Sequence, residues 1–242
     1  FFRKVTVYVG TDDPSKFELF KDTKNVIVKK YTREQLREWT RIVPHSKLSY
    51  IYFIKLMMLK DLARGNHTIL MDTDIIFTHK ITRIFNNFQE DISYMNEREW
   101  QLKSDMSHYM DFVNAYNRPD IINRETYMWN SGFVGIHKSN LSLIDDIIKL
   151  LKSFVSFKYQ LYNKYLKIYP PQKFGKPYDN HRTVEQLAVG VVLARYTTIK
   201  QTWDLYYHYY ENKEKIHPII SAYVAEMRKH SLKDLLYKEE FE

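Results

Sequence analysis

The chain has no cysteine among its 242 residues. This absence excludes a disulfide framework, zinc bound by cysteine, iron–sulfur clusters and any thiol nucleophile. Glycine is scarce as well, because the sequence has only six and none of them stands in a Walker-like array. A chain of this length can still bury about 70 to 75% of its unfolded surface, so it needs neither disulfides nor a structural metal to hold a core.

Long hydrophobic runs are also missing. A membrane-spanning helix needs about 18 to 20 uninterrupted apolar residues, and the longest apolar run, residues 187–194, is far shorter. The chain as given starts at Phe1 and carries no signal peptide. We therefore expect a cytoplasmic protein, with peripheral attachment to the inner face of a membrane as the alternative.

The charges that are present are unbalanced. Lysine and arginine number 37 against 29 aspartate and glutamate, which gives a net charge of +8. Such a balance favours anionic partners, namely phosphates, nucleic acid or an acidic membrane surface. Because the basic residues are dispersed and form no arginine-rich run, we do not expect nucleic acid to be the partner.

Strand-like and helix-like patterns alternate along the chain. Short β-branched or apolar runs predict strands, and apolar residues at helical spacing predict helices. This order indicates an α/β fold with a mostly parallel central sheet flanked by helices, and no linker or repeat divides the single domain, 1–242. The predicted strands cover 5–9, 25–30, 68–71, 92–95 and 132–136, and the predicted helices cover 32–39, 49–64, 141–165 and 184–195.

The strongest chemical signal is the acidic triplet Asp72-Thr73-Asp74, which stands between two apolar runs. Buried carboxylates must be paired, hydrogen-bonded or bound to a cation, because burying them alone costs several kcal/mol each. In an extended chain residues i and i+2 share a face, so the two carboxylates form a pair of hard oxygen donors. Mn²⁺ or Mg²⁺ suits such a pair and completes its shell with phosphate oxygens. The alternative is that both carboxylates cap the next helix or pair with lysine or arginine.

Residues 69–77, preceded by the predicted helix 49–64, resemble the nucleotide-sugar-binding half of GT-A fold glycosyltransferases. The similarity is to the retaining group that includes bacterial lipooligosaccharide galactosyltransferases and glycogenin. It covers about two thirds of the chain in ordered fragments. The resemblance implies a Rossmann-like GT-A domain with a nucleotide-sugar-binding half over about 1–100 and an acceptor and catalytic half over about 101–215. The spacing of apolar residues, and not the resemblance, predicts an amphipathic helix at the end of the same domain, over 216–242.

The resemblance also implies donor-binding residues. Gly10, Thr11 and Asp12 match the loop after the first strand, which holds uracil and ribose in that family. Lys55 matches a basic residue on the family's helix near the donor diphosphate, and Lys213 is a second candidate for the same charge. Both lysines have an ordinary alternative as solvated surface residues.

Further matches concern the metal and the reacting sugar. His208 falls where the family has a third metal ligand, although the family's glycine and Lys-Pro-Trp do not follow it and His217 is a rival. Asn130, in Asn-Ser-Gly, matches the contact to the donor sugar, but the same three residues are typical of a turn. Glu185 and Gln186 match the acidic residue and glutamine near the anomeric carbon.

The role of Glu185 stays open at this point. It could be a nucleophile, could stabilise an oxocarbenium-like state, or could simply be the acid that a helix N-terminus favours. Asp179 and Asp204 are alternative carboxylates, and an inverting enzyme would use one such group as a base. Retention of configuration follows from the resemblance and from nothing else in the sequence.

We therefore expect a metal-dependent glycosyltransferase that moves a hexose from a UDP-sugar to a saccharide or glycan acceptor, using Mn²⁺ or Mg²⁺. The alternatives are a nucleotidyl or phosphoryl transferase with a paired-aspartate metal site, and a non-catalytic basic module that binds glycan or nucleic acid.

The basic loop 169–182 could close over the donor. The tail 222–241 has amphipathic spacing, and its alternatives are packing on the domain and contact with an anionic membrane that carries a lipid-linked acceptor.

Overall fold

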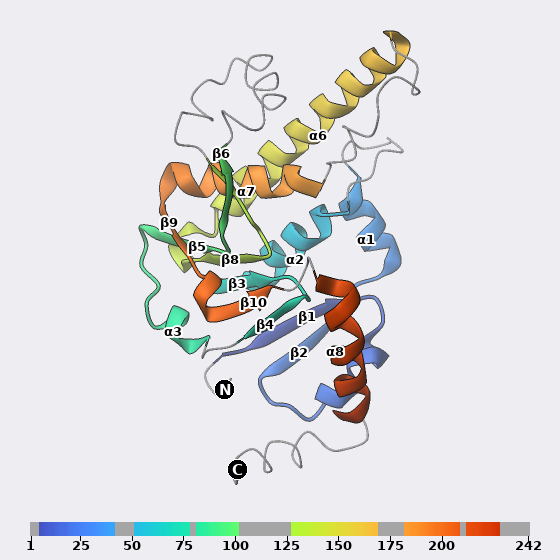
Figure 1. The fold of residues 1–242 in the computed structure, drawn as a ribbon, viewed down its shortest axis with the longest axis vertical. Helices are drawn as coiled ribbons and strands as arrows, with labels where there is room; N and C mark the ends of the chain where they lie inside the picture. Colours follow the sequence, from blue (N-terminus) through green and yellow to red (C-terminus); the bar gives the residue numbers. More distant parts are fainter. Residues whose placement is uncertain are drawn as a thin grey trace.

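The computed structural model describes residues 5–41, 51–77, 81–101, 127–168, 182–208 and 212–227. Helices and strands are interleaved along the described chain, and Figure 1 shows the strands stacked through the middle of the molecule with helices around them. The strands are β1 (Val7–Thr11), β2 (Val26–Lys30), β3 (Thr68–Met71), β4 (Ile75–Phe77), β5 (Ile92–Met95), β6 (Arg98–Gln101), β7 (Tyr127–Trp129), β8 (Phe133–Ile136), β9 (Thr198–Gln201) and β10 (Tyr206–His208). The α-helices are α1 (Arg33–Thr40), α2 (Phe53–Ala63), α3 (Thr82–Phe85), α6 (Leu143–Ile168), α7 (Arg182–Tyr196) and α8 (Lys213–Met227), and the 3₁₀ turns are Pro14–Phe20, Lys138–Asn140 and Trp203–Leu205.

The sheet topology is mixed. A four-stranded sheet has the order β3-β8-β5-β9, in which β8 is antiparallel to both of its neighbours and β9 is parallel to β5. The pair β1-β2 is parallel, whereas the pairs β4-β10 and β6-β7 are antiparallel. The structure is therefore a mixed α/β fold, and the prediction of a mostly parallel sheet is wrong.

The antiparallel pairs join strands that are far apart in the chain. β3, at 68–71, pairs with β8, at 133–136, and β4, at 75–77, pairs with β10, at 206–208. A parallel crossover between consecutive strands needs a dozen or more residues, usually with a helix, whereas only residues 72–74 separate β3 from β4. The alternating pattern that predicts parallel crossovers therefore does not apply to the strands around the acidic triplet.

Apolar side chains form a core on each face of the four-stranded sheet. Val134 and Ile136 of β8 join a cluster with α2, α6 and α7, while Phe133 joins a smaller cluster with Tyr94 and Tyr206. Neighbouring residues of β8 point to opposite faces, as the period of two in a strand requires. Because β8 is buried on both faces, its sequence is a continuous apolar run.

The helices α1 and α2 follow the N-terminal strands in the chain. Thr32 caps α1, since its side chain accepts a hydrogen bond from the Gln35 backbone at 3.1 Å. β1 lies directly against α2, because a Cβ added at Gly10 would lie 2.6 Å from the Met58 sulfur and 2.9 Å from the Tyr31 ring. Gly10, predicted to bind the donor, thus has a packing reason to be glycine.

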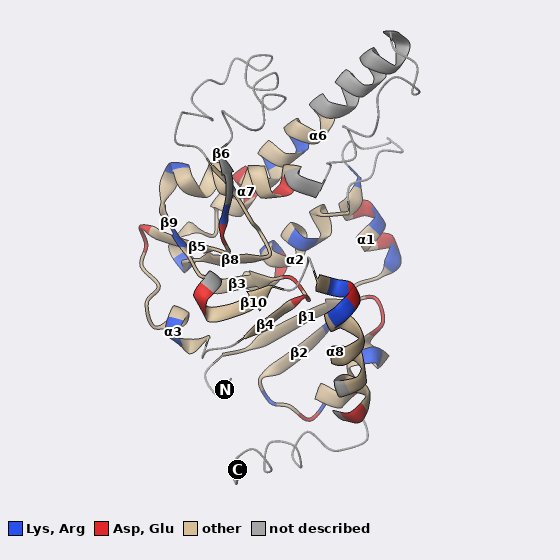
Figure 2. Cartoon of the chain, viewed as in Figure 1, with Lys and Arg blue, Asp and Glu red and all other residues tan. Residues whose placement is uncertain are grey.

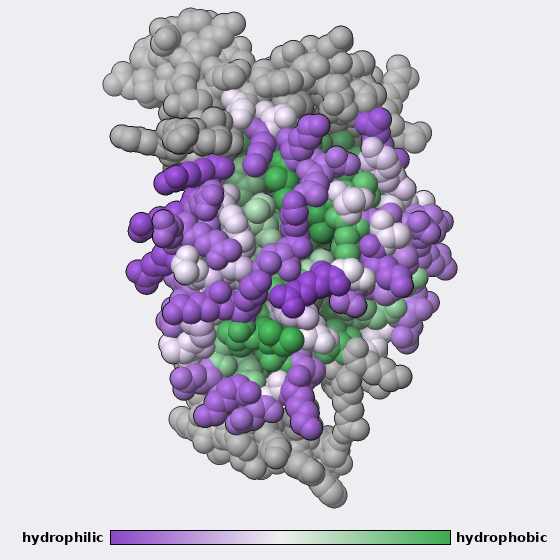
Figure 3. Space-filling model, turned by 180° about the vertical axis from the view of Figure 1, so that it is seen from behind, coloured by the Kyte–Doolittle hydropathy of each residue, from purple (hydrophilic) through white to green (hydrophobic). Residues whose placement is uncertain are grey.

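In the view of Figure 1, α8 stands in front of the right-hand ends of β1 and β2. It begins three residues before the predicted C-terminal helix of 216–242, and residues 228–242 lie outside the described part of the chain. Its Ile219 and Val224 side chains are exposed. On the back of the molecule hydrophilic residues cover most of the surface, with separate hydrophobic areas between them (Figure 3). Among the described helices, none combines the length and the apolar character that crossing a bilayer requires.

Candidate functional site

The acidic triplet forms the turn between β3 and β4. The Asp72 backbone N–H donates to the Gly132 carbonyl at 2.8 Å, which ties the turn to the segment just before β8. Asp74 is buried, whereas Asp72 is half-buried. Figure 2 shows this acidic turn close to the basic first turn of α8. The two carboxylates therefore lie in a turn that is held against the segment before β8, and Asp74 is not a solvated surface group.

His208 joins these carboxylates at the end of β10. Because β10 runs antiparallel to β4, with His208 opposite Ile75, the ring is carried back to the acidic turn. One donor atom from each of Asp72, Asp74 and His208 lies within 4.8 Å of the others. Among the described residues this is the one group of three such side chains, so His217, which is exposed and within hydrogen-bond distance of Ser221 at 3.2 Å, is not part of it.

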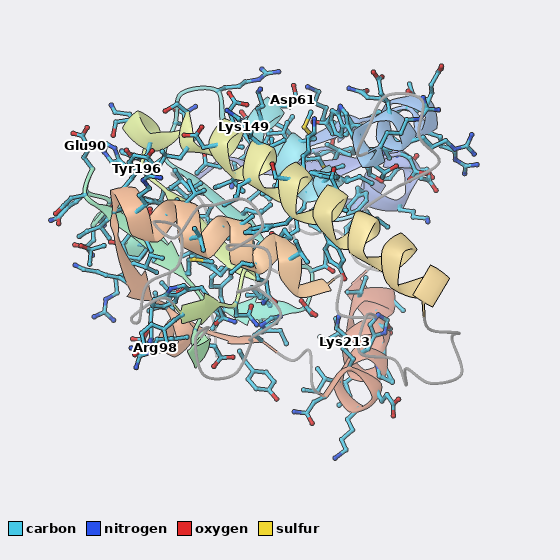
Figure 4. The ribbon with its side chains drawn as sticks, turned by 90° about the horizontal axis from the view of Figure 1, so that it is seen from above. Asp61, Glu90, Arg98, Lys149, Tyr196 and Lys213 are labelled. Atoms are coloured by element: carbon cyan, nitrogen blue, oxygen red, sulfur yellow. The ribbon has the colours of Figure 1, made fainter. Side chains whose placement is uncertain are left out.

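Asp74 has two differently occupied oxygens. Oδ2 lies 2.6 Å from the ammonium of Lys213, which is the first residue of α8 and is labelled in Figure 4. Oδ1 lies 3.3 Å from His208 Nε2 and, within the described part of the chain, is buried and accepts no hydrogen bond. Burial opposes the charge of Asp74, but Lys213 and His208 outweigh it and lower the pKa of this carboxyl.

The donor set fits a divalent cation. Two carboxylates and an imidazole are ligands that Mn²⁺ and Mg²⁺ sites use, with carboxylate oxygen preferred by both ions. A buried carboxylate oxygen that accepts no hydrogen bond is costly unless a positive charge satisfies it. Asp74 Oδ1 is such an atom, and it lies beside a ring nitrogen that is itself a ligand type.

Lys55 of α2 connects the acidic turn with Glu185. Its ammonium lies 2.8 Å from Asp72 Oδ1 and 3.7 Å from Glu185 Oε2. Only 17% of the Lys55 side chain is exposed, so it is not a solvated helix residue. Burial works against its charge, yet the carboxylates of Glu185 and Asp72 outweigh this and raise the pKa of Lys55. The residue therefore stays positively charged at neutral pH.

Glu185 lies in the first turn of α7 and is 1% exposed. The Ser131 hydroxyl donates to its Oε2 at 2.6 Å, while Oε1 is buried and, among the described residues, has no hydrogen-bond partner. Burial raises the pKa of Glu185, against the opposite effects of Lys55 and Ser131. A helix N-terminus favours an acid but does not require it to be buried, so the position of Glu185 needs a further reason.

This raised pKa predicts a pH-dependent contribution to stability. Below the ordinary glutamate pKa of about 4.3 the side chain is protonated in both states, so its contribution to stability is fully present and does not change with pH. As the pH rises from there, the unfolded chain releases its proton before the folded one, so the free energy of unfolding falls until the folded chain is deprotonated as well. We expect the stability of the wild type, relative to Glu185→Gln, to decrease as the pH rises above about 4 in urea titrations. A relative stability that rises over this range would contradict the assignment.

The segment 130–132 shapes the space around His208. Asn130 Oδ1 accepts a hydrogen bond from the Gly132 N–H at 2.8 Å, and the Asn130 N–H donates to the Glu97 carbonyl at 2.9 Å. A Cβ at Gly132 would lie 2.7 Å from His208 Cε1. Asn130 thus forms the turn that its residue type predicts, and this turn borders the cation-ligand group.

Other predicted residues lie apart from this group or beyond the described chain. Thr11 accepts from the Asp13 N–H at 3.1 Å, and Asp12 pairs with Arg33 at 3.4 Å on the surface. Gln186 is half-buried beside Glu185 on α7. The remaining candidates are placed as follows: Asp204 is exposed in the 3₁₀ turn before β10, and Asp179 with the loop 169–181 lies outside the described residues.

Three residues near the site, Ser131, Asn96 and Tyr206, were not predicted from the sequence. Ser131 orients Glu185, and the Asn96 amide lies 2.9 Å from His208 Nδ1. The one signal for Asn96 is its place directly after the predicted strand 92–95, where side chains of neighbouring strands meet.

Compared with known proteins, the sequence matches no protein-family model and no curated protein.

Proposed function

We propose that this protein is a metal-dependent glycosyltransferase with a GT-A type fold, which moves a hexose from a UDP-sugar to a saccharide or glycan acceptor with retention. The observation that carries the proposal is the group of Asp72, Asp74 and His208 with two lysines in contact with its carboxylates. Such a group offers both a place for a cation and fixed positive charge for a diphosphate. The mixed α/β architecture is compatible with this proposal.

The positive charges suit the step that a nucleotide-sugar transferase must accelerate. The bond between the anomeric carbon and the diphosphate oxygen breaks, and its electron pair leaves with the diphosphate. Mn²⁺ or Mg²⁺, held by Asp72, Asp74 and His208, would supply positive charge against that leaving group when bound. Lys55 and Lys213 would add charge that is already oriented, which is most effective in a site with little water.

Glu185 would act on the sugar side of the same bond. Its carboxylate is held by Ser131 and Lys55 at the edge of the cation-ligand group. A fixed negative charge there stabilises the positive charge that develops at the anomeric carbon as the bond breaks. The acceptor oxygen then bonds to that carbon, and its proton goes to the departing diphosphate.

The proposals for the acceptor and for the location of the protein rest on the surface of α8. α8 exposes Ile219 and Val224, and its first turn carries Lys213 and Lys215. Apolar and basic groups on one helix suit the surface of an anionic membrane. We therefore include a lipid-linked glycan among the acceptors, with the protein at the cytoplasmic face of the membrane.

The first experiment measures the thermal midpoint with UDP and with GDP, each with and without Mn²⁺. A ligand at about 100 times its dissociation constant adds about 2.7 kcal/mol to stability, which raises the midpoint by a few degrees. We expect a rise that needs both UDP and Mn²⁺ and that disappears in Asp74→Asn. Asp145→Asn is the matched control, because Asp145 also pairs with a lysine, Lys60, but on the exposed surface.

The outcomes separate the functions. No rise with either nucleotide would refute the donor site and favour a binding module without catalysis. The same measurement is repeated with nucleoside triphosphates, and a rise that exceeds the one with UDP would favour the nucleotidyl transferase. That alternative uses two metals and a third carboxylate, whereas the third donor here is His208 and Glu185 is paired with Lys55.

A further inference from the structure

His208 is one end of a line of buried polar side chains. The Asn96 amide lies 2.9 Å from Nδ1 of the ring, and the Tyr206 hydroxyl lies 2.9 Å from the other end of that amide. The Thr202 hydroxyl is 3.0 Å from the Tyr206 oxygen and 2.9 Å from the Met95 carbonyl oxygen. Asn96, Thr202 and Tyr206 are at most 4% exposed. Each contact in this line must therefore contain a proton, because water does not reach these groups.

The carbonyl at the far end fixes the direction of the protons. Met95 O can only accept, so the single hydroxyl proton of Thr202 points to it. The contact between Thr202 and Tyr206 must then contain the proton of Tyr206, because no other proton remains for it. A tyrosine phenol is protonated at neutral pH, because its ordinary pKa is about 10.

The amide of Asn96 has two orientations that occupy the same space. With its nitrogen toward the ring, its oxygen would take the proton of Tyr206, and the 3.0 Å contact between Thr202 and Tyr206 would contain none. With its oxygen toward the ring, the amide N–H donates to Tyr206 and every contact contains one proton. The second orientation requires the proton of the neutral ring to be on Nδ1, since an oxygen faces that atom.

We infer that Tyr206 and Asn96 are positioning residues that hold neutral His208 in the tautomer with its proton on Nδ1. The lone pair is then on Nε2, which lies 3.3 Å from Asp74 Oδ1. Two electron-rich atoms that face each other at this distance are stabilised by a cation between them. The cation role rests on the proposed function, whereas the tautomer does not.

The tautomer is measured without any metal. The two ring nitrogens of a neutral histidine have different ¹⁵N chemical shifts, so a spectrum of histidine-labelled protein at about pH 8, above the ordinary histidine pKa of about 6.5, identifies the protonated one. The chain has nine histidines, and His208→Gln assigns the signal of interest. We expect the proton on Nδ1 in the metal-free wild type.

Tyr206→Phe tests what holds the proton there. This change removes the hydroxyl and keeps the ring, which stacks on Phe133 at 5.0 Å between centroids. Without the hydroxyl the amide is free to rotate, so we expect a shift toward the tautomer protonated on Nε2. The matched control is Tyr94→Phe, because Tyr94 is a buried tyrosine on β5 whose hydroxyl donates to the Asn87 carbonyl at 2.8 Å and not to the line that ends at His208.

Asn96→Asp and Asn96→Leu give the conservative test. An aspartate can accept from both the ring and Tyr206, so it should keep the proton on Nδ1, whereas leucine should not. Loss of such supporting contacts usually lowers metal affinity about 10- to 100-fold. We therefore expect calorimetry to show Mn²⁺ affinity lowered by that factor in Tyr206→Phe and Asn96→Leu, and not in Tyr94→Phe or Asn96→Asp.

The inference is overturned by a proton on Nε2 in the metal-free wild type, or by a tautomer that Tyr206→Phe leaves unchanged. A proton on Nδ1 that moves in Tyr206→Phe supports it. If the wild type shows that behaviour and yet binds no Mn²⁺, the tautomer assignment stands and the proposed function fails. The two hypotheses are thus separated by measurements on the same samples.

Discussion

Replacing Lys55 by methionine is expected to destabilise the fold by about 3 to 5 kcal/mol. Removing one partner of a buried ion pair leaves the other charge without compensation, which is costly in this range. Lys55 is the ammonium in contact with both Asp72 and Glu185, and Glu185 is almost fully buried. Methionine has nearly the same length and is apolar, so the loss measured is that of the charge. Urea denaturation gives the free energy directly.

A second substitution makes this prediction specific. If the unpaired carboxylate of Glu185 is the cause, Lys55→Met combined with Glu185→Gln should recover much of the lost stability, because the double variant buries no uncompensated charge at that position. Lys60→Met is the matched control on the same helix, since Lys60 pairs with Asp145 on the exposed surface. Exposed pairs contribute about 0 to 1 kcal/mol. Equal losses in Lys55→Met and Lys60→Met would show that burial of the pair is not what matters.

Glu185→Gln is expected to lower the turnover of glycosyl transfer about 10²- to 10³-fold, which is typical when one oriented electrostatic group of an active site is removed. Glutamine keeps the shape of the side chain and can accept the hydrogen bond of Ser131, but it carries no charge. Binding of UDP with Mn²⁺ should change little, because the proposed role of Glu185 is on the sugar side of the donor. Kinetics with a UDP-sugar and calorimetry with UDP measure the two effects separately.

The matched control is Glu90→Gln, which changes an exposed glutamate on the loop before β5 (Figure 4). It should leave turnover and UDP binding at the values of the wild type. A Glu185→Gln variant that keeps full turnover would remove Glu185 from the chemistry and restrict it to holding Lys55. A variant that loses turnover and UDP binding together would instead point to collapse of the site.

Local sequence patterns predicted the longer elements well. The strands expected near 5–9, 25–30, 68–71, 92–95 and 132–136 are confirmed, as are the helices that became α1, α2, α6 and α7. Apolar runs mark the strands and the buried helices, and capping or stop residues mark helix ends, for example Thr32 before α1. Their signals lie within a few neighbouring residues, which is why one sequence suffices to find them.

The arrangement around the site could not be predicted in the same way. β4 and β10 have three residues each, too few for a period to be recognised, and their pairing joins segments that are far apart in the chain. The burial of Lys55 and Glu185 was equally hidden, because a lysine on a helix and an acid at a helix start are ordinary on a surface. The proposed roles of Asp72, Asp74 and His208 stay predictions, although the fold brings the three side chains together.

The contacts of Lys55 and Lys213 set the net charge that a metal ion and a nucleotide would meet on binding. Asp72, Asp74 and Glu185 provide three negative charges, and Lys55 and Lys213 provide two positive ones, so the site has a surplus of one negative charge. A divalent ion alone reverses this surplus, and a diphosphate alone triples it. The two together leave it unchanged. Because Asp74, Lys55 and Glu185 are largely buried, unbalanced charge beside them is expensive. Metal and nucleotide should therefore enter as an electroneutral pair, each making the arrival of the other more favourable.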